Sequence, residues 1–366
     1  MSSLKITNIS NKNNDSGAVV SGVSTVTNGN FTLPSGTTAQ RVGIESGSLR
    51  YNTTDNIIEF YNGTSWLAIS QSSTSVFSRG LFGGGNIGPA LQNLIDYITI
   101  ASTGNATDFG DLSQARRNLA ACSSSTRGVF GGGYFPANSN VIDYITIATT
   151  GNATDFGDLT VARPGPAGCS SSTRGVFGGG GPAPTDSNVI DYITIATTGN
   201  ATDFGDLTLG RRTPAACSSS TRGVFSGGYS PTVTNVIDYI TIATTGNAID
   251  FGDLTAASRT QAGCSSATRG VFGGGLVGPT SSNAIDYITI ATTGNATDFG
   301  DLTEARYLLA GCSSSTRGVF GGGYSPNKST IDYITIATIG NATIFGDLTV
   351  ARGYLAGCSN NHGGLL

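Results

Sequence analysis

The second part of this chain, from about residue 76 to its end, consists of six copies of one repeat. Each copy contains Arg-Gly, Ile-Asp-Tyr-Ile-Thr, Gly-Asn-Ala, Phe-Gly-Asp-Leu and Cys-Ser, in that order. The cysteines mark the copies at intervals of 46 to 48 residues: Cys122, Cys169, Cys217, Cys264, Cys312 and Cys358. Repeats of this length bury their apolar faces by stacking on one another, so the six copies are expected to form one architecture.

Each copy contains four candidate strands, which we call a, b, c and d. In the second copy they are residues 119–124, 128–132, 141–148 and 155–159. Four strands of five or six residues with four loops of about five fill roughly 44 residues, which leaves no room for a helix. Strand c has apolar groups on both faces, as in a sheet that is covered on both sides. The sequence therefore predicts an all-β protein with six four-stranded blades arranged as a β-propeller.

Four features of each copy resemble the kelch family. In the second copy they are a double glycine after an apolar strand (Val129 to Gly132), Tyr144, Phe156 and the pair Ala162 and Arg163. The resemblance covers residues 78–366 and implies a kelch-like β-propeller, with Phe in place of the usual Trp. Two copies depart further, with Ser226 inside a glycine cluster and Ser258 at the position of the arginine. A linear β-solenoid is the alternative architecture, although 47 residues is long for one coil.

The ends of the repeat region predict how the ring closes. The first Arg-Gly, at Arg79, follows residues 71–77, which lack the signature of strand a. A complete strand a with no successor lies at residues 354–359. We therefore expect this last strand to pair with residues 79–84, which completes the first blade and leaves no open sheet edge.

Residues 1–75 are predicted to form a small separate β module and a linker, followed by the propeller at 76–366. Turn signals at residues 54–56 and 62–63 separate three short strands. The stretches Leu33 to Arg41 and Ser48 to Ile69 resemble short segments in tail fibres and other appendages of tailed bacteriophages, particularly those of cyanobacteria. The resemblance implies a virion protein whose N-terminal module attaches to other virion proteins or forms a homo-oligomer such as a trimer. A module this small buries little surface alone, which also favours oligomerisation or docking.

Composition excludes several classes of function. The formal net charge is −4 and only three of the 19 basic residues are lysines, so no basic stripe exists for nucleic acid. There is no signal peptide and no apolar run near 18 residues, which predicts synthesis in a cytoplasm and no membrane insertion. The cysteines repeat at equivalent positions of different blades, so we expect reduced thiols and no disulfide.

The sequence predicts no catalytic residue, no metal site and no cofactor. The one histidine is His362, so a Ser-His-Asp or Cys-His site would depend on it alone. Carboxylate pairs such as Asp108 and Asp111 offer acid-base chemistry or Ca²⁺ binding as an alternative. They recur in most copies, however, and we expect them to cap turns or to pair with arginines of the Arg116 and Arg127 type. The Asn-Ala-Thr sequences, which match a glycosylation acceptor, are interpreted as turns.

Variation between the copies is confined to two of the four loops. The ab and cd loops are nearly constant, whereas the bc and da loops differ in sequence and, for bc, in length. Because strands alternate in direction, the two variable loops emerge on the same face, which we call the variable face. It is enriched in side chains typical of recognition surfaces. The expected contact residues are Tyr134, Phe135, Tyr229, Tyr307, Tyr324, Tyr354, Arg117, Arg212, Arg259 and Lys328.

These observations favour a non-enzymatic tail fibre or similar appendage that recognises a host-surface glycan or protein through the variable face. One alternative is a structural decoration protein of the capsid or tail without a ligand. Another is a polysaccharide-degrading enzyme, which would need two carboxylates on the variable face. The variable loops contribute few acidic residues, Asp186 being the exception.

Overall fold

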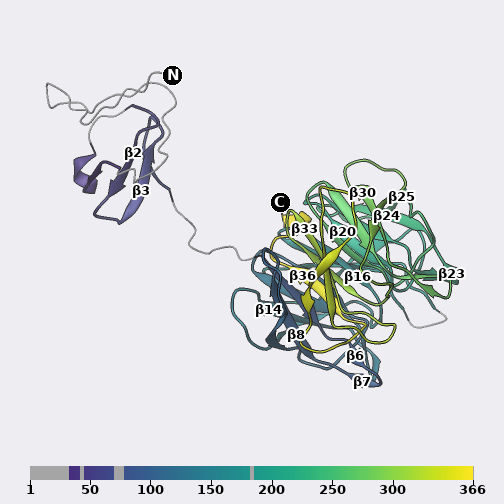
Figure 1. Ribbon diagram of the computed structural model, residues 1–366. Coiled ribbons are helices and arrows are strands. Elements are labelled where there is room, and N and C mark those ends of the chain that lie inside the picture. The colour runs from purple at the N-terminus through teal and green to yellow at the C-terminus, as the bar shows by residue number, and fades with distance from the viewer. Residues whose placement is uncertain (1–32, 42–44, 70–77, 182–184, 366) are drawn as a thin grey trace. The chain divides into compact units, whose positions relative to one another are not determined.

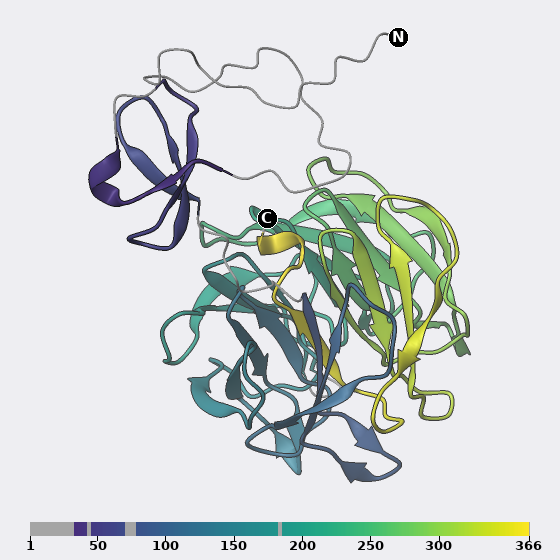
Figure 2. The same ribbon diagram turned by 60° about the vertical axis from the view of Figure 1, so that its left-hand side comes forward.

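The computed structural model describes residues 33–41, 45–69, 78–181 and 185–365, in two compact units: residues 1–75 and 76–366. Each unit is described by itself. The second unit contains six four-stranded antiparallel sheets that radiate from a common centre (Figures 1 and 2). This is the predicted six-bladed β-propeller. No helix in the described part of the chain is long and apolar enough to cross a membrane.

Blade 2 illustrates the common pattern. Its strands are β10 (Ala120–Ser123), β11 (Arg127–Gly131), β14 (Val141–Thr146) and β15 (Thr154–Asp158), which correspond to a, b, c and d. The remaining complete blades, given from strand a to strand d, are blade 3 with β16 (Ala167–Ser170), β17 (Arg174–Gly178), β18 (Val189–Thr194) and β19 (Thr202–Asp206); blade 4 with β20 (Ala215–Ser218), β21 (Arg222–Ser226), β24 (Val236–Thr241) and β25 (Ile249–Asp253); blade 5 with β26 (Ala262–Ser265), β27 (Arg269–Gly273), β30 (Ala284–Thr289) and β31 (Thr297–Asp301); and blade 6 with β32 (Ala310–Ser313), β33 (Arg317–Gly321), β34 (Thr330–Thr335) and β35 (Thr343–Asp347).

Blade 1 is assembled from both ends of the propeller unit, as predicted. Its inner strand is β36 (Ala356–Ser359), which pairs with β5 (Arg79–Gly83); β8 (Leu94–Thr99) and β9 (Thr107–Asp111) complete the sheet. Cys358 lies opposite Leu81 in this pairing. The yellow β36 lies among the strands near the centre of the ring in Figure 1. Residues 71–77, which were expected to lack strand a, lie outside the described residues.

The repeated cysteine and glycine belong to one packing contact between blades. Each cysteine sits on strand a, is buried and is free, as predicted. Its sulfur faces the glycine of the Arg-Gly pair in the next blade; a Cβ on Gly80 would lie 2.5 Å from Cys312 Sγ. Any larger residue there would push the blades apart. Burial raises the pKa of Cys169, Cys264 and Cys358 to about 12, so these thiols are unreactive at neutral pH.

Buried ion pairs hold the da loop against the following blade. Arg116 Nη2 donates to Asp143 Oδ2 at 2.9 Å, with both side chains fully buried. Equivalent pairs occur in four further blades: Arg163 with Asp191, Arg211 with Asp238, Arg306 with Asp332 and Arg352 with Asp96. The predicted partner was wrong, since the acid belongs to strand c rather than to the Asp108 and Asp111 group.

The constant loops form a second set of contacts between blades. Asn152 Oδ1, in the cd loop of blade 2, accepts the backbone N–H of Asp111 in blade 1 at 3.1 Å, and the same contact recurs around the ring. Arg127 does not pair with an aspartate: its Nη1 donates to the carbonyls of Ile195 and Ala196 in blade 3, and its guanidinium lies over Tyr144. The Asn-Ala-Thr sequence is therefore a clamp between blades as well as a turn.

The N-terminal unit is a four-stranded sheet with the predicted three strands and one short addition. β2 (Leu49–Asn52), β3 (Ile57–Tyr61) and β4 (Trp66–Ile69) are antiparallel, and β1 (Ser35–Gly36) pairs with β2 in parallel; a 3₁₀ turn, η1, spans Thr38–Gln40.

Polar groups are buried on one face of this small sheet. Glu59 accepts from Arg41 at 2.6 Å and lies 3.4 Å from Arg50 Nε. The Arg41 hydrogen bond, aided by Asn52 and the charge of Arg50, lowers the pKa of Glu59 although burial opposes the shift. The pairing register places six apolar or aromatic side chains on the opposite face: Leu49, Tyr51, Ile58, Phe60, Leu67 and Ile69. Four of these are exposed, so the apolar face of the unit carries little cover from the described residues.

Candidate functional site

The variable face is built from bc hairpins that pair with da loops. The hairpins are β6 (Asn86–Ile87) with β7 (Ala90–Leu91), β12 (Tyr134–Phe135) with β13 (Ala137–Asn138), β22 (Tyr229–Ser230) with β23 (Thr232–Val233), and β28 (Leu276–Val277) with β29 (Thr280–Ser281). A backbone bridge ties each to the loop before its blade, as between Arg117 and Tyr134. The bc loop of blade 3 includes residues 182–184, which lie outside the described residues.

A closed ring of backbone hydrogen bonds surrounds the axis on this face. One residue from each da loop donates its N–H to the carbonyl of the equivalent residue in a neighbouring blade, at 2.7 to 3.1 Å. The six residues have φ between 52° and 68°: Asn118, Gly165, Thr213, Thr260, Leu308 and Tyr354. Five of them are not glycine and adopt the left-handed conformation at a cost, which the ring of hydrogen bonds offsets. The centre of the face is thereby fixed in shape.

Tyrosine and arginine side chains contact one another beside this ring. The Arg117 guanidinium lies 5.3 Å from the ring centroids of both Tyr134 and Tyr354. Tyr354 contacts Tyr324 at 6.5 Å between centroids, and Tyr324 contacts Tyr307 at 5.5 Å. Burial and the two neighbouring tyrosines raise the pKa of Tyr307. The contact between Arg117 and Tyr354 joins residues that are more than 200 positions apart in the sequence.

The series continues through a second cluster. Tyr229 lies between Arg212 and Arg259, with guanidinium to centroid distances of 4.3 and 5.0 Å. The charge of Arg259 also acts on Tyr307, where it opposes the rise in pKa. We call the whole series the Tyr-Arg arc: Tyr134, Arg117, Tyr354, Tyr324, Tyr307, Arg259, Tyr229 and Arg212. It contains eight of the ten expected contact residues.

The other two expected residues differ from the arc. Phe135, on the short strand β12, is 42% exposed. Lys328 is not a free cation, because its Nζ lies 2.7 Å from Glu304 Oε2. Tyr324 is the most exposed member of the arc, at 38%. Phe135 and Tyr324 are therefore the side chains best placed to contact another molecule.

Both carboxylates found among these loops are paired with cations. Asp186 Oδ1 lies 3.2 Å from Arg212 Nη1. Glu304, which the sequence reasoning overlooked, lies beside Lys328 and Arg306. Burial alone would raise the pKa of Glu304, but hydrogen bonds from Lys328 and Thr330 and the two positive charges lower it. A general acid of a glycosidase needs a raised pKa, whereas the pKa of Glu304 is lowered.

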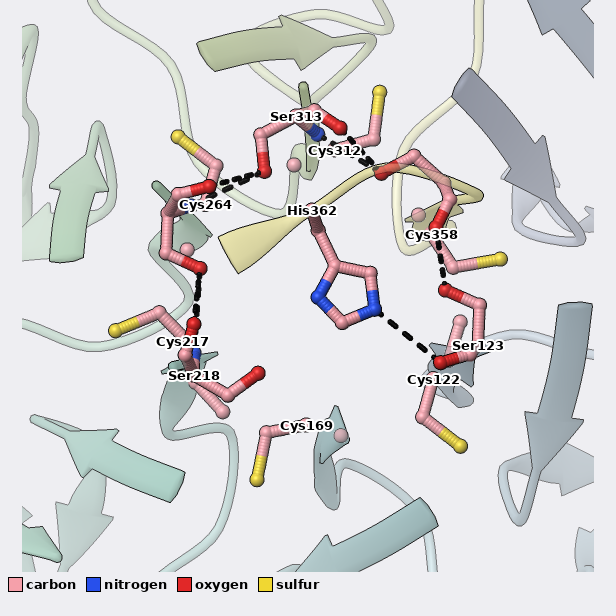
Figure 3. A pocket seen from close by; sticks show the side chains of 18 of the residues that line it. Cys122, Ser123, Cys169, Cys217, Ser218, Cys264, Cys312, Ser313, Cys358 and His362 are labelled. Atoms are coloured by element: carbon pink, nitrogen blue, oxygen red, sulfur yellow. Dashed lines mark hydrogen bonds between the residues drawn. The ribbon is translucent and has the colours of Figure 1, made fainter. Parts of the chain in front are cut away.

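The channel along the axis is narrow and closed by polar contacts. Six serines, one from each strand a, form a ring in which each hydroxyl donates to the carbonyl of the preceding serine at 2.6 to 2.9 Å. His362 enters the centre of this ring (Figure 3). The remaining cavity is about 50 Å³, room for little more than water.

His362 is held as a neutral imidazole in the channel. Its Nε2 lies 3.2 Å from the Ser123 carbonyl, which can only accept, so Nε2 carries the proton. Its Nδ1 accepts the N–H of Gly364 at 3.0 Å. Burial lowers the pKa of His362 to about 4, against a weaker opposing effect of the bond to Ser123. The sequence offered no signal for this role beyond the presence of a single histidine.

We expect the contribution of His362 to stability to be lost in acid. The unfolded side chain takes up a proton near pH 6.5 whereas the folded one resists until about pH 4, so stability falls as the pH drops through this interval. Protonation of Nδ1 would also replace its hydrogen bond from the Gly364 N–H with two donors that face each other. The melting-temperature difference between the wild type and His362→Gln should shrink between pH 7.5 and pH 4, because only the wild type has the buried imidazole. The aspartates titrate in both proteins, so their effect cancels in the difference. A constant difference would contradict the assignment.

No protein-family model matches this chain, and no curated protein is significantly similar to it. In the described residues no group of three or more His, Cys, Asp or Glu side chains is arranged to hold a metal ion.

Proposed function

We propose that this chain is a non-enzymatic virion appendage protein, such as a tail fibre of a tailed bacteriophage, that recognises a host-surface glycan or protein through the Tyr-Arg arc. The observation that carries the proposal is the arc itself. Tyrosine and arginine provide large planar contact surfaces, and their mutual stacking fixes them before a ligand arrives. Sugars and protein loops are both bound well by such surfaces.

The N-terminal unit supports the attachment role. Its apolar face carries Leu49, Ile58, Leu67 and Ile69, all exposed, while its charged groups are neutralised on the other face. An apolar patch rimmed by polar residues is typical of a protein interface. We propose that it packs against other virion proteins or against equivalent units in a homo-oligomer, for which a trimer fits the resemblance.

The ab and cd loops form the opposite face of the propeller, which we call the constant face. Its loops are clamped to neighbouring blades through Asn152, Arg127 and their equivalents, so drift is restricted there for structural reasons. One-sided variation alone therefore also fits a decoration protein without a ligand. The arc is the observation that favours recognition, because its side chains remain partly exposed and come from several blades.

Truncating the two most exposed aromatic side chains of the variable face, Phe135 beside the arc and Tyr324 within it, is expected to weaken recognition with little loss of stability. We expect Phe135→Ala and Tyr324→Ala each to weaken adsorption to host cells by at least about 10-fold, as for central aromatic contacts at interfaces. The measurement is binding of the purified, labelled protein to susceptible cells, with the melting temperature recorded for each variant.

The matched control is Thr150→Ala, an exposed threonine in the cd loop of the constant face. It should bind as the wild type does. Asn200→Ala is unsuitable, because Asn200 Oδ1 holds the Asp158 N–H of the preceding blade and its loss should lower stability. If all three variants bind equally, or if the wild type binds no susceptible cell, the recognition function fails and the decoration function replaces it.

A further inference from the structure

Five blades contain a buried slot that is filled by a guanidinium group. In blade 2, the Arg116 Nη atoms donate to the Asp143 carboxylate at 2.9 Å and to the carbonyls of Val141 and Phe130 at 2.6 and 3.0 Å. In blade 1, Arg352 makes the equivalent bonds to Asp96 and Phe82. Each slot thus presents one carboxylate and a set of backbone carbonyls to a monovalent cation.

In blade 5 the arginine that fills this slot is absent. Ser258 stands at the arginine position, and its N–H bonds the Thr234 carbonyl as the Arg116 N–H bonds Gln92. Asp286 lies opposite Phe272 in the same register that places Asp143 opposite Phe130. Among the described residues no basic side chain forms an ion pair with Asp286.

Two buried polar atoms at this place have no partner. Ser258 is 2% exposed and its Oγ accepts or donates no hydrogen bond, and Gln261 Oε1 is likewise buried and unpaired. A Cβ on Gly275 would lie 2.6 Å from both Ser258 Oγ and Gln261 Cγ, which places the two side chains together. The equivalent glycines of blades 4 and 6, Gly228 and Gly323, would meet the Cδ atoms of the slot arginines, so Ser258 Oγ lies where an arginine side chain runs in those blades. Native proteins rarely leave a buried polar atom unsatisfied, which makes this position a candidate for a bound species.

We propose that the blade 5 slot is a binding site for one small monovalent cation, held by the Asp286 carboxylate, Ser258 Oγ and the carbonyls that face the guanidinium in the other blades. A single carboxylate balances a single positive charge, and an all-oxygen set suits a hard alkali cation or an N–H cation such as guanidinium. Thr255 already donates to Asp286 but carries no charge.

Access and electrostatics agree with this site. Asp286 is 5% exposed, whereas the five paired aspartates are 0% exposed, so Asp286 is the one residue of the six that solvent reaches. Burial without a cation raises the pKa of Asp286, against the Thr255 hydrogen bonds. A bound cation would remove the cost of burying this charge.

The test is a melting-temperature titration of the full chain with guanidinium chloride in the low millimolar range, well below denaturing concentrations. Parallel titrations use potassium chloride and tetramethylammonium chloride at matched ionic strength. We expect guanidinium or potassium to raise the melting temperature saturably and tetramethylammonium, which is too large for the slot and has no N–H, to leave it unchanged. Calorimetric titration of the wild type with the active cation should give one site per chain.

Ser258→Arg is the matched variant. It should melt at a higher temperature than the wild type, because an arginine fills the slot in five blades, and it should no longer respond to the cation. Asp286→Asn should also lose the response to the cation. It replaces Ser258→Arg as the test variant if Ser258→Arg does not fold. No saturable response in the wild type, no calorimetric site, or an equal response in the wild type and in a folded variant would overturn the proposal.

Discussion

Deleting residues 354–366 is expected to abolish cooperative unfolding of the propeller at ordinary temperatures. The deletion removes Leu355 and the strand β36, so that two of the buried clusters between blades lose Leu355, Ala356 and Cys358. It also leaves β5 without its inner partner and breaks the serine ring at Ser359. Several buried side chains at about 1.5–3 kcal/mol each, with an opened sheet edge, approach the whole stability of a typical domain.

The measurement is thermal unfolding followed by circular dichroism and calorimetry. Deleting only residues 361–366 is the control, since it removes His362 and the turn η2 (Gly363–Leu365) but keeps all six blades closed. We expect a modest fall in melting temperature for the control and loss of the transition for the longer deletion. An unchanged transition in the longer deletion would show that β36 does not close the ring.

Asp143→Asn is expected to destabilise the protein by about 3–5 kcal/mol, because it leaves the fully buried Arg116 guanidinium without its counterion. For a unit of this size, that corresponds to a fall of roughly 10 °C in melting temperature. Chemical denaturation gives the free energy of unfolding directly. The Asn side chain has nearly the same shape as Asp, so cavity formation contributes little.

Asp286→Asn is the internal control for this effect, measured in buffer without alkali cations. The two aspartates occupy equivalent positions and accept equivalent hydrogen bonds, from Ser113 and from Thr255. Only Asp143 faces an arginine. We expect the change at Asp286 to be neutral or stabilising; equal losses at both positions would mean that the arginine contributes nothing.

The sequence predicts the blades and their closure because each depends on a local signal that is repeated. The Arg-Gly pair, the Ile-Asp-Tyr-Ile-Thr run and the Cys-Ser segment each coincide with a strand. The extra copy of strand a at residues 354–359 could pair at only one place in the ring, beside Arg79, because only the first blade lacked an inner strand. Six copies of a pattern remove most of the ambiguity that one copy carries.

Contacts between blades were less predictable, because no local pattern shows which aspartate an arginine meets. Arg116 was assigned to Asp108 or Asp111, close in sequence, but the blade geometry brings it to Asp143. The clamp by Asn152 and the position of His362 depend likewise on the neighbouring blade. The left-handed residues on the axis escaped notice since five of the six are not glycine, as Tyr354 illustrates.

The sequence was enough to predict the face that carries the candidate site, but not the contacts between its side chains. The alternating direction of the strands places the variable loops on the same face. The stacking of Arg117 between Tyr134 and Tyr354 requires the closed ring, because Tyr354 comes from the last copy and Tyr134 from the second. The Lys328 and Glu304 pair was missed because Glu304 belongs to a da loop and Lys328 to a bc loop, and no local pattern shows that the two meet.

The recognition function is tested most directly by hydrogen exchange of the full chain with and without envelope material from a susceptible host. The account predicts protection at the bc and da loops that carry the arc, around Tyr134, Tyr229 and Tyr324, and no change at the cd loops around Asn152. Protection confined to the cd loops or to the N-terminal sheet, or no protection at all, would contradict it.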